Sequence, residues 1–287
     1  MVKLWQAALL VFVVVAGILF LKREPLMLAW VAVNTEQTSL DQRIDLIKDN
    51  IEVRLPDEGA PPYPVVLQFH GCAGIRPPFQ EQWADIANRA GYAAVIVDSN
   101  GPRGFSRDEA LDVVCGGKAL IGQERAGDVA AAIKIAQNDD RLDASHLVLA
   151  GWSHGGWSVM DFLTMDGKTR TPAGLTGWNG EQAAVDGAIL FYPYCGPGAL
   201  SRFRGWTQAP KTLAFVAGAD EMVDAQECLS YFEARQSEDA RIDLIFYEDA
   251  HHVFDDPFLE PDWIHWYNED YFNDAARRYE AFLEGLN

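Results

Sequence analysis

Short apolar runs alternate with longer amphipathic segments along most of the chain. The apolar runs are rich in β-branched and aromatic residues and are bounded by Gly-, Asn- or Asp-containing turns, the pattern of buried strands. The predicted strands are residues 50–55, 65–70, 92–98, 146–149, 188–192, 211–216 and 241–247. The predicted helices are residues 80–90, 122–137, 156–163, 225–235 and 273–286. This alternation predicts an α/β protein with a doubly wound, mostly parallel sheet and helices on both faces.

Four stretches have no clear period. Residues 34–49 are polar and form a connector or a short helix, and residues 99–117 form a loop rich in Gly and Pro. Residues 166–182 are polar and Gly-rich, which makes them a candidate cap or rim loop. Residues 251–268 form an aromatic, acidic loop. We find no internal repeat and no sign of a second globular domain.

The N-terminal segment has a different pattern. Residues 4–21 are apolar apart from Gln6, and basic residues flank them on both sides. This pattern predicts an uncleaved signal anchor at 1–24, with a cleaved signal peptide and a buried core helix as the alternatives. A connector at 25–48 then leads to a single α/β domain at 49–287.

Acidic residues outnumber basic ones. Among 287 residues, 42 are acidic and 23 are basic, which gives a net charge of −19. Nucleic acids and anionic membrane surfaces attract basic patches, so neither is an expected partner of the domain. Membrane contact is expected through the N-terminal segment only, and the acidity is interpreted as a solubility feature. The sequence does not indicate an oligomeric state.

The cysteines indicate a compartment rather than a metal site. None forms a C-x-x-C pair or lies at zinc-ligand spacing from a histidine, so no metal is expected. An even number behind an export-like segment predicts two disulfides, with three connectivities to choose from; four buried free thiols are the alternative. We expect a membrane-anchored protein whose domain is periplasmic or extracellular, or a secreted one if the segment is cleaved. The four cysteines are Cys72, Cys115, Cys195 and Cys228.

A glycine-rich turn follows the predicted strand at 146–149. Residues 151–156 read G-W-S-H-G-G and contain G-x-S-x-G with Ser153 at its centre. A serine on a sharp strand-to-helix turn projects its hydroxyl from the sheet edge, where a substrate reaches it. The glycines permit the steep backbone angles of such a turn. The motif predicts a nucleophile, with a purely structural turn as the alternative.

Five polar residues with acid, base or nucleophile chemistry each follow a predicted strand. The carboxyl ends of parallel strands meet at one edge of the sheet, where the sites of such folds lie. Their placement therefore predicts one shared site. The five residues are His70, Asp98, Ser153, Asp220 and His252.

A serine hydroxyl needs a general base, and the base needs a third group that holds its tautomer. In this fold both lie downstream of the serine, with the acid first. His252 is the predicted base because it closely follows the last strand; His251 and His265 are the alternatives. Asp220 is the predicted acid. Asp224 is the alternative, although its place before a predicted helix suits an N-cap.

The oxyanion formed during acyl transfer needs two backbone N–H donors. One is expected from His154, directly after the serine, and the other from the loop H-G-C-A-G at 70–74, where Cys72 is the candidate. We expect the His154 side chain at the rim of the site. A catalytic Cys72 thiol is an alternative that its distance from the elbow in the sequence disfavours.

Further polar residues are candidate substrate contacts. Arg103, in G-P-R-G, and Arg125 either contact an anionic group of the substrate or form ion pairs that fix the loops. The ion pairs are the favoured interpretation, with Asp98 and Asp128 as partners. The candidate contacts are His70, Arg103 and His251.

At these motifs the chain resembles the dienelactone hydrolase family of α/β hydrolases, over about residues 50–286. The resemblance implies an α/β-hydrolase fold, a triad of Ser153, Asp220 and His252, and no metal or organic cofactor. The shared motifs are H-G-C-A-G at 70–74, D-S-N-G-P-R-G at 98–104, G-W-S-H-G-G at 151–156, G-A-D at 218–220 and A-H-H-V-F at 250–254.

Two features depart from the namesake enzymes. These use a cysteine nucleophile where this chain has Ser153, and they carry an acidic residue at the position of Gly71. Dienelactone is therefore not the expected substrate. The chain is more similar to the exported, serine-nucleophile branch of the family. That similarity implies two disulfides, Cys72–Cys115 and Cys195–Cys228.

These residues together predict a serine hydrolase that cleaves a small carboxylic ester through an acyl-enzyme. A peptidase or amidase of the prolyl-peptidase type is the first alternative, because such enzymes share this core. A non-catalytic binding protein on the same scaffold is the second. It would be expected to lack a member of the triad, and none is missing.

Overall fold

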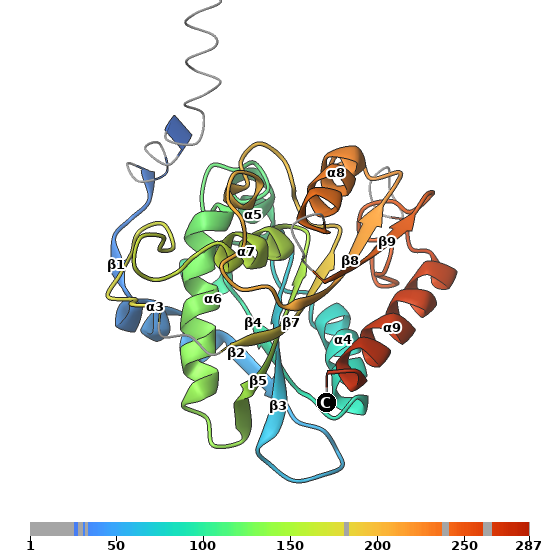
Figure 1. Ribbon diagram of the computed structural model, residues 1–287, viewed down its shortest axis with the longest axis horizontal. Coiled ribbons are helices and arrows are strands. Elements are labelled where there is room, and N and C mark those ends of the chain that lie inside the picture. The colour runs from blue at the N-terminus through green and yellow to red at the C-terminus, as the bar shows by residue number, and fades with distance from the viewer. Residues whose placement is uncertain are drawn as a thin grey trace, which may run out of the picture. The chain divides into compact units, whose positions relative to one another are not determined.

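The structure is a computed structural model that describes residues 26–27, 31, 34–180, 184–236, 241–260 and 266–286 (Figure 1). The chain forms two compact units, Met1–Glu36 and Gln37–Asn287, and the elements below belong to the second. The predicted anchor at 1–24 lies outside the described residues. Within the described ranges, no helix combines the length and the apolar character needed to cross a membrane.

In the described part of the chain, seven strands form one mostly parallel sheet. They are β2 Ile51–Arg54, β3 Tyr63–Phe69, β4 Ala93–Val97, β5 Leu142–Trp152, β7 Val185–Phe191, β8 Lys211–Ala217 and β9 Ile242–Tyr247. Their order across the sheet is β2-β4-β3-β5-β7-β8-β9. Strand β2 is antiparallel to β4 at one edge, and the other neighbours are parallel. The predicted α/β class and doubly wound sheet are confirmed.

Helices cover both faces of this sheet. They are α3 Leu40–Ile47, α4 Pro77–Arg89, α5 Arg107–Val113, α6 Gly122–Gln137, α7 His154–Leu163, α8 Ala225–Gln236 and α9 Glu269–Glu284. Figure 1 shows α3 and α6 on one face and α4 and α9 on the other. Strands β3, β5 and β7 are central and mostly buried, as their nearly continuous apolar runs predict.

One helix differs from the prediction. Residues 99–117, predicted as a loop, contain α5, which begins with a capping box. The Ser106 hydroxyl accepts a hydrogen bond from the Glu109 N–H (3.3 Å), and the Glu109 carboxylate accepts one from the Ser106 N–H (2.9 Å). This Ser-x-x-Glu pattern is the sequence signal for the helix, and the surrounding glycines and prolines obscure it.

An aromatic cluster fills the space between the sheet and helices α4 and α9. Trp83 packs against Trp152 and Phe191, with ring centroids 5.8 and 4.6 Å apart, and lies 5.2 Å from Tyr279. The rings of Trp152 and Phe191 stack at 5.1 Å. Each such pair contributes about 0.5–1.5 kcal/mol beyond the burial of its area. Trp152 directly precedes Ser153, so this core fixes the position of the turn that follows β5.

Two disulfides hold the segments that follow β3 and β7: one joins two loops, and the other joins a loop to helix α8. Cys72 is bonded to Cys115 and Cys195 to Cys228, so all four cysteines are oxidised. The pairs are those that the family resemblance implies, and the alternative of four free thiols is wrong. The bonds close segments of 43 and 33 residues, and each is worth about 2–4 kcal/mol, largely by restricting the unfolded chain.

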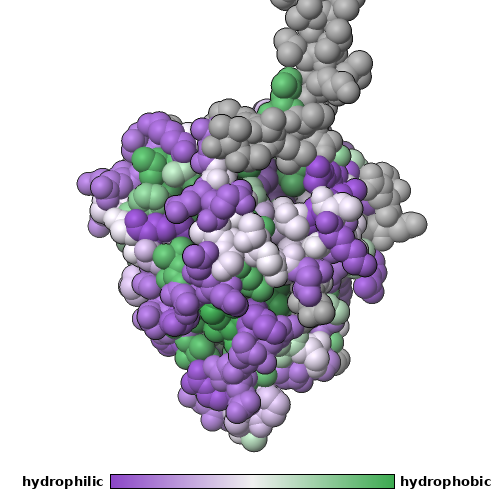
Figure 2. All heavy atoms as spheres, turned by 90° about the vertical axis from the view of Figure 1, so that its left-hand side faces the viewer, coloured by the Kyte–Doolittle hydropathy of each residue, from purple (hydrophilic) through white to green (hydrophobic). Residues whose placement is uncertain are grey.

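The surface agrees with the acidic composition. On the face shown in Figure 2, hydrophilic residues cover most of the described surface, and apolar residues occur in small separate patches. This pattern is consistent with the interpretation of the net charge of −19 as a solubility feature.

Candidate active site

Ser153 lies in a sharp turn between β5 and α7, in a conformation that is rare for a residue with a side chain. Its φ is 53° and its ψ is −112°, which costs about 1–3 kcal/mol. Close backbone packing surrounds the turn. A Cβ atom at Gly155 would lie 2.8 Å from the His70 carbonyl oxygen, and one at Gly151 would lie 2.6 Å from the Gly155 carbonyl oxygen. These glycines therefore let β3 and α7 approach, as the G-x-S-x-G motif predicts.

Ser153, His252 and Asp220 form a continuous chain of hydrogen bonds. The Ser153 Oγ lies 3.0 Å from His252 Nε2, and His252 Nδ1 lies 2.7 Å from Asp220 Oδ2. The Asp220 carboxylate also accepts hydrogen bonds from the N–H groups of Met222 and Val223 (2.8 and 2.9 Å), which fix its orientation. Since a carboxylate only accepts, the proton of the neutral ring is on Nδ1, and Nε2 can accept the serine proton.

The alternative acid and bases have other partners. Asp224 accepts hydrogen bonds from two N–H groups in the first turn of α8 (2.9 and 3.1 Å), as an N-cap does. His251 is bonded through Nδ1 to Glu221 (2.5 Å), and its ring stacks on Trp266. His265 lies outside the described residues. Among the described residues, the acid and base that reach the serine are therefore the predicted pair.

The loop after β3 packs against the nucleophile. A Cβ atom at Gly71 would lie 3.7 Å from the Ser153 Cβ. The Gly71 carbonyl is held by His70 Nδ1 (2.5 Å) and by the Gly74 N–H (3.3 Å). Because a trans peptide is planar, the N–H of Cys72 points away from that carbonyl and is left for another acceptor. The Cys72 sulfur is in a disulfide, so it offers no thiol as a nucleophile.

His154 begins α7 directly after the serine. N–H groups in the first turn of a helix have no intrahelical acceptor, and the helix dipole concentrates positive charge there. The His154 side chain is buried, packs against Trp157 with ring centroids 5.0 Å apart, and is bonded through Nδ1 to Arg125 (3.2 Å). The rim position predicted for this side chain is wrong, because α7 turns it into the interior.

A cleft of about 120 Å³ opens at Ser153. Leu111 of α5 and Met222 form part of its exposed apolar mouth, so the helix that the prediction missed contributes to the rim. None of the described residues 166–180 lines the cleft, so the rim loop predicted there is wrong; its strand β6 (Leu175–Thr176) pairs with β1 (Thr38–Ser39) instead. The apolar wall includes Phe79, Trp152, Tyr192, Val253 and Leu259.

His70, Arg103 and His251 are not among the residues that line this cleft. His70 is 1% exposed, and its Nε2 accepts a hydrogen bond from the Ser99 N–H (3.0 Å). Arg103 donates to both carboxylate oxygens of Asp128 (2.9 and 3.1 Å) and to the Ser99 carbonyl (2.6 Å). The ion-pair interpretation therefore describes Arg103.

A buried carboxylate supports the loop that carries His252. Asp255 accepts hydrogen bonds from Trp152 Nε1 (3.0 Å) and from the Tyr192 hydroxyl (2.7 Å). The Tyr192 ring in turn packs edge-on against His252, with centroids 4.7 Å apart. Burial raises the pKa of Asp255 to about 6. Sequence reasoning missed this residue, because its partners come from distant strand ends.

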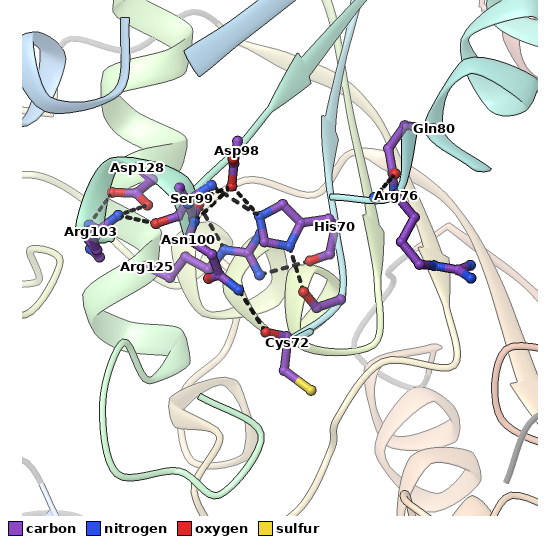
Figure 3. A network of polar contacts seen from close by, with 12 residues as sticks. His70, Cys72, Arg76, Gln80, Asp98, Ser99, Asn100, Arg103, Arg125 and Asp128 are labelled. Atoms are coloured by element: carbon purple, nitrogen blue, oxygen red, sulfur yellow. Dashed lines mark hydrogen bonds and ion pairs between the residues drawn. The ribbon is translucent and has the colours of Figure 1, made fainter. Parts of the chain in front are cut away.

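A second polar network lies behind the loop after β3 (Figure 3). The Asn100 side-chain amide donates to the Cys72 carbonyl (2.8 Å). Arg125 of α6 donates to the His70 carbonyl (2.8 Å) and to the Ser99 hydroxyl (3.0 Å). The sequence indicates only that Arg125 is a charged residue on a predicted helix with a buried apolar face. It does not show which residues Arg125 contacts.

Comparison with known proteins gives a family. Residues 51–285 match the Dienelactone hydrolase family. The chain is also similar to the acylamino-acid-releasing enzyme of Homo sapiens, at 23% identity over 249 residues, which covers 74% of this chain and 32% of the human protein. "Probable dipeptidyl-aminopeptidase B" of Sclerotinia sclerotiorum is 27% identical over 209 residues, which covers 68% of this chain and 22% of that protein. The chain thus spans a third or less of the length of these curated relatives.

Solved structures share the fold. A structure from Klebsiella pneumoniae named as a dienelactone hydrolase has a TM-score of 0.60 at 16% identity and covers 81% of this chain and 91% of that one. Esterase 2 of Thermogutta terrifontis, phosphorylated by paraoxon, has a TM-score of 0.63 at 15% identity, covering 83% and 88%. These similarities show the α/β-hydrolase fold. With the family match over most of its length, the chain belongs to the dienelactone hydrolase family.

Proposed function

We propose that the protein is a serine esterase in which Ser153 is the nucleophile, His252 the general base and Asp220 the acid that orients the base. The observation that carries this proposal is the hydrogen-bond chain at the elbow. It runs over 3.0 Å from Ser153 Oγ to His252 Nε2 and over 2.7 Å from His252 Nδ1 to Asp220. A serine activated by a base that a third group orients is the arrangement that acyl transfer requires.

Acylation begins when Ser153 Oγ attacks the carbonyl carbon of the bound ester. His252 Nε2 takes the hydroxyl proton, and the electron pair of the C=O bond moves to its oxygen. The N–H groups of Cys72 and His154 stabilise this oxyanion. When the oxyanion collapses, the bond to the alcohol oxygen breaks, His252 protonates the leaving alkoxide, and an acyl-enzyme remains.

Deacylation repeats the same steps with water. His252 removes a proton from a water molecule as the water oxygen attacks the acyl carbon. Collapse of the second oxyanion breaks the bond to Ser153, which regains its proton from His252, and the carboxylic acid leaves. Asp220 remains ionised throughout and stabilises the imidazolium that forms in each half of the reaction.

The cleft supports a small acyl group as the part of the ester held next to the serine. Its volume is about 120 Å³, and its wall includes the aromatic side chains of Phe79, Trp152 and Tyr192. Structures of Thermogutta terrifontis esterase 2 with bound propionate and with bound butyrate have the same fold as this chain. We therefore propose short-chain esters as substrates.

We further propose that the protein is membrane-anchored, with its domain on the periplasmic or extracellular side. The apolar stretch 4–21 supports an anchor, and the two disulfides support an oxidising compartment. Protease added to cells whose outer layers are opened while the cytoplasmic membrane stays sealed is expected to remove the domain. Protection of the domain until the cytoplasmic membrane is also opened would contradict this location.

The enzymatic proposal is tested with the purified full-length chain. We expect turnover of p-nitrophenyl acetate and butyrate, and Ser153→Ala is expected to lower kcat by about 10⁵-fold or more. Ser145→Ala, at an exposed serine at the start of β5, is the matched control and is expected to retain activity. Equal loss in both variants would contradict the role of Ser153.

The alternative substrates separate in the same assay. The human relative is named an acylamino-acid-releasing enzyme, which makes a peptide bond the second candidate. An acylated amino-acid p-nitroanilide turned over faster than the matching p-nitrophenyl ester would favour a peptidase. A folded wild-type chain that hydrolyses neither substrate would favour the non-catalytic binding protein.

A further inference from the structure

We infer that Arg125 is a positioning residue of the oxyanion hole. Its guanidinium ties the loop that carries Cys72 to the elbow that carries His154, and it places a fixed positive charge behind both N–H groups. This inference rests on the proposed function, because it assigns Arg125 a part in stabilising the oxyanion of that reaction.

A single nitrogen of Arg125 contacts both segments. Its Nη1 lies 2.8 Å from the His70 carbonyl oxygen, two residues before Cys72, and 3.2 Å from the Nδ1 of His154. Its Nε donates to the Ser99 hydroxyl at 3.0 Å. Figure 3 shows the guanidinium beside His70 and Ser99, behind the loop after β3. Arg125 is 0% exposed, so solvent does not screen these contacts.

The hydrogen bonds also determine where the positive charge lies. An arginine only donates, so His154 Nδ1 accepts and that ring is neutral with its proton on Nε2. Burial and the charge of Arg125 both hold the pKa of His154 well below its usual value. His70 Nε2 lies closer to the Ser99 N–H (3.0 Å) than to the Asp98 carboxylate (3.4 Å), so it accepts and this ring is neutral too.

No carboxylate bonds Arg125 directly in the described part of the chain, although Asp128 and Asp98 lie nearby. The Asp128 oxygens accept hydrogen bonds from Arg43 (2.9 Å) and Arg103 (2.9 and 3.1 Å). Burial lowers the pKa of Arg125 to about 10, so the group remains a cation at neutral pH. A buried cation bonded only to neutral groups is unfavourable, and its place near the N-terminal end of α6 opposes the helix dipole. Packing alone therefore does not explain the residue.

The two segments lie directly against each other, so a donor shared between them can fix their spacing. A Cβ atom at Gly155 would lie 2.8 Å from the His70 carbonyl oxygen, so the two segments touch at this oxygen. It is the same oxygen that accepts the hydrogen bond from Arg125. Asn100 holds the Cys72 carbonyl at 2.8 Å and completes the support. Without Arg125, the His70 carbonyl loses a charged donor and the spacing of the two N–H groups is no longer fixed. The loss should appear in the transition state, where the oxyanion forms, and much less in substrate binding.

The test compares Arg125→Met and Arg125→Lys in the full-length chain. With p-nitrophenyl acetate, we expect Arg125→Met to lower kcat by about 100-fold and to change KM by less than about threefold. The affinity for an alkyl boronic acid, which forms a tetrahedral adduct with the serine, should fall by a similar factor. Arg125→Lys keeps the positive charge but lacks the forked donors of a guanidinium. Its kcat should be about tenfold higher than that of Arg125→Met.

Arg43→Met is the matched control, since Arg43 is a second buried arginine (2% exposed) that packs on α6, where it bonds Asp128. It should lower the melting temperature and leave kcat and boronate affinity unchanged. A folded Arg125→Met protein with kcat and boronate affinity like wild type would overturn the inference alone. A wild-type chain without esterase activity would instead refute the proposed function and this inference together.

A second variant applies if Arg125→Met does not fold. His154→Phe keeps the volume and the buried arginine but removes the acceptor on the elbow, and should lower kcat about tenfold with KM nearly unchanged. Unchanged kcat in a folded His154→Phe protein would overturn the inference.

Discussion

Two polar networks meet at Ser153, and they are built in different ways. Toward the cleft, His252 joins the Ser153 hydroxyl to the Asp220 carboxylate, over 3.0 and 2.7 Å. Behind the oxyanion segments, a buried arginine contacts two neutral histidines, His70 and His154, through the His70 carbonyl (2.8 Å) and the His154 ring (3.2 Å). In the proposed reaction, the first network moves a proton, and the second holds the N–H donors in place while negative charge develops. The Asp220 carboxylate thus lies beside the imidazolium of the proposed reaction, and the Arg125 guanidinium lies behind the segments that bind its oxyanion.

The two networks also differ in how they are assembled. The first uses loops after β5, β8 and β9, whose side chains converge because parallel strands end at one edge. The second draws on α6 and on the ends of β3 and β4, and its contacts are divided between backbone carbonyls and side chains. Substitutions in the first network should therefore abolish catalysis. Substitutions in the second network, or in the disulfide that holds the Cys72 loop, should only lower kcat.

The largest effect is expected for the base. His252→Ala should lower kcat by about 10⁶-fold, because the serine then has no acceptor for its proton. His251→Ala removes the neighbouring histidine, which bonds Glu221 at 2.5 Å, and should retain most activity. Steady-state kinetics of both variants with p-nitrophenyl acetate checks this. A large loss of kcat in His251→Ala with little loss in His252→Ala would show that His251, and not His252, is the base.

A smaller loss is expected for the acid. Asp220→Asn keeps the shape of the side chain but favours the wrong tautomer of His252, and should lower kcat by about 10⁴-fold. Asp224→Asn alters the N-cap of α8 instead and should retain kcat, with a loss of unfolding free energy of about 1 kcal/mol or less. Kinetics with thermal melts of both variants makes the comparison. Equal kcat in the two variants would contradict the assignment of Asp220.

The disulfides should separate stability from activity. Each Cys→Ala double variant should lose about 2–4 kcal/mol of unfolding free energy. Only the pair Cys72→Ala, Cys115→Ala frees the loop that supplies an oxyanion donor, so it alone should also lower kcat, by about tenfold. The pair Cys195→Ala, Cys228→Ala is the control. Denaturant melts and kinetics measure both, and equal kcat in the two would show that the bond at Cys72 does not position the donor.

The smallest effect concerns the pH dependence of stability. Asp255 has an ordinary pKa of 3.8 that burial raises to about 6, so between these values the folded state holds a proton that the unfolded chain has lost. The wild type therefore loses stability as the pH rises through this range, by roughly 3 kcal/mol in total. Asp255→Asn does not titrate and can still donate to Tyr192 and accept from Trp152.

Denaturant melts at pH 4, 5, 6 and 7 measure this difference. The unfolding free energy of Asp255→Asn minus that of the wild type should rise between pH 4 and 6 and then level off. A difference that does not change with pH, or that falls, would contradict a raised pKa of Asp255.

Sequence reasoning reaches the first network and misses most of the second for a physical reason. Ser153, Asp220 and His252 each follow a strand, so chain order and strand periodicity place them at one edge before any contact is known. Arg125 lies on a helix whose bounds, 122–137, are predicted correctly, yet its partners come from β3, β4 and α7. Which donor meets which carbonyl depends on packing that no local pattern encodes.

Two errors in the fold prediction concern helix α5 and the start of strand β5. Helix α5 is short, and its capping box at Ser106 and Glu109 lies among glycines and prolines that indicate a loop. Strand β5 begins at Leu142, ahead of the predicted 146–149, because exposed polar residues at its start interrupt the apolar run. For α5 one local signal hides another, whereas for β5 the pairing with β3 outweighs the local pattern.

The central claim is that Ser153 is the nucleophile, and covalent labelling tests it most directly. The folded full-length chain is treated with a fluorophosphonate, and the adduct is located by mass spectrometry of its peptides. We predict one adduct per chain, on Ser153, and none in Ser153→Ala. An unlabelled wild-type chain that is shown to be folded, or an adduct on another residue, would contradict the account.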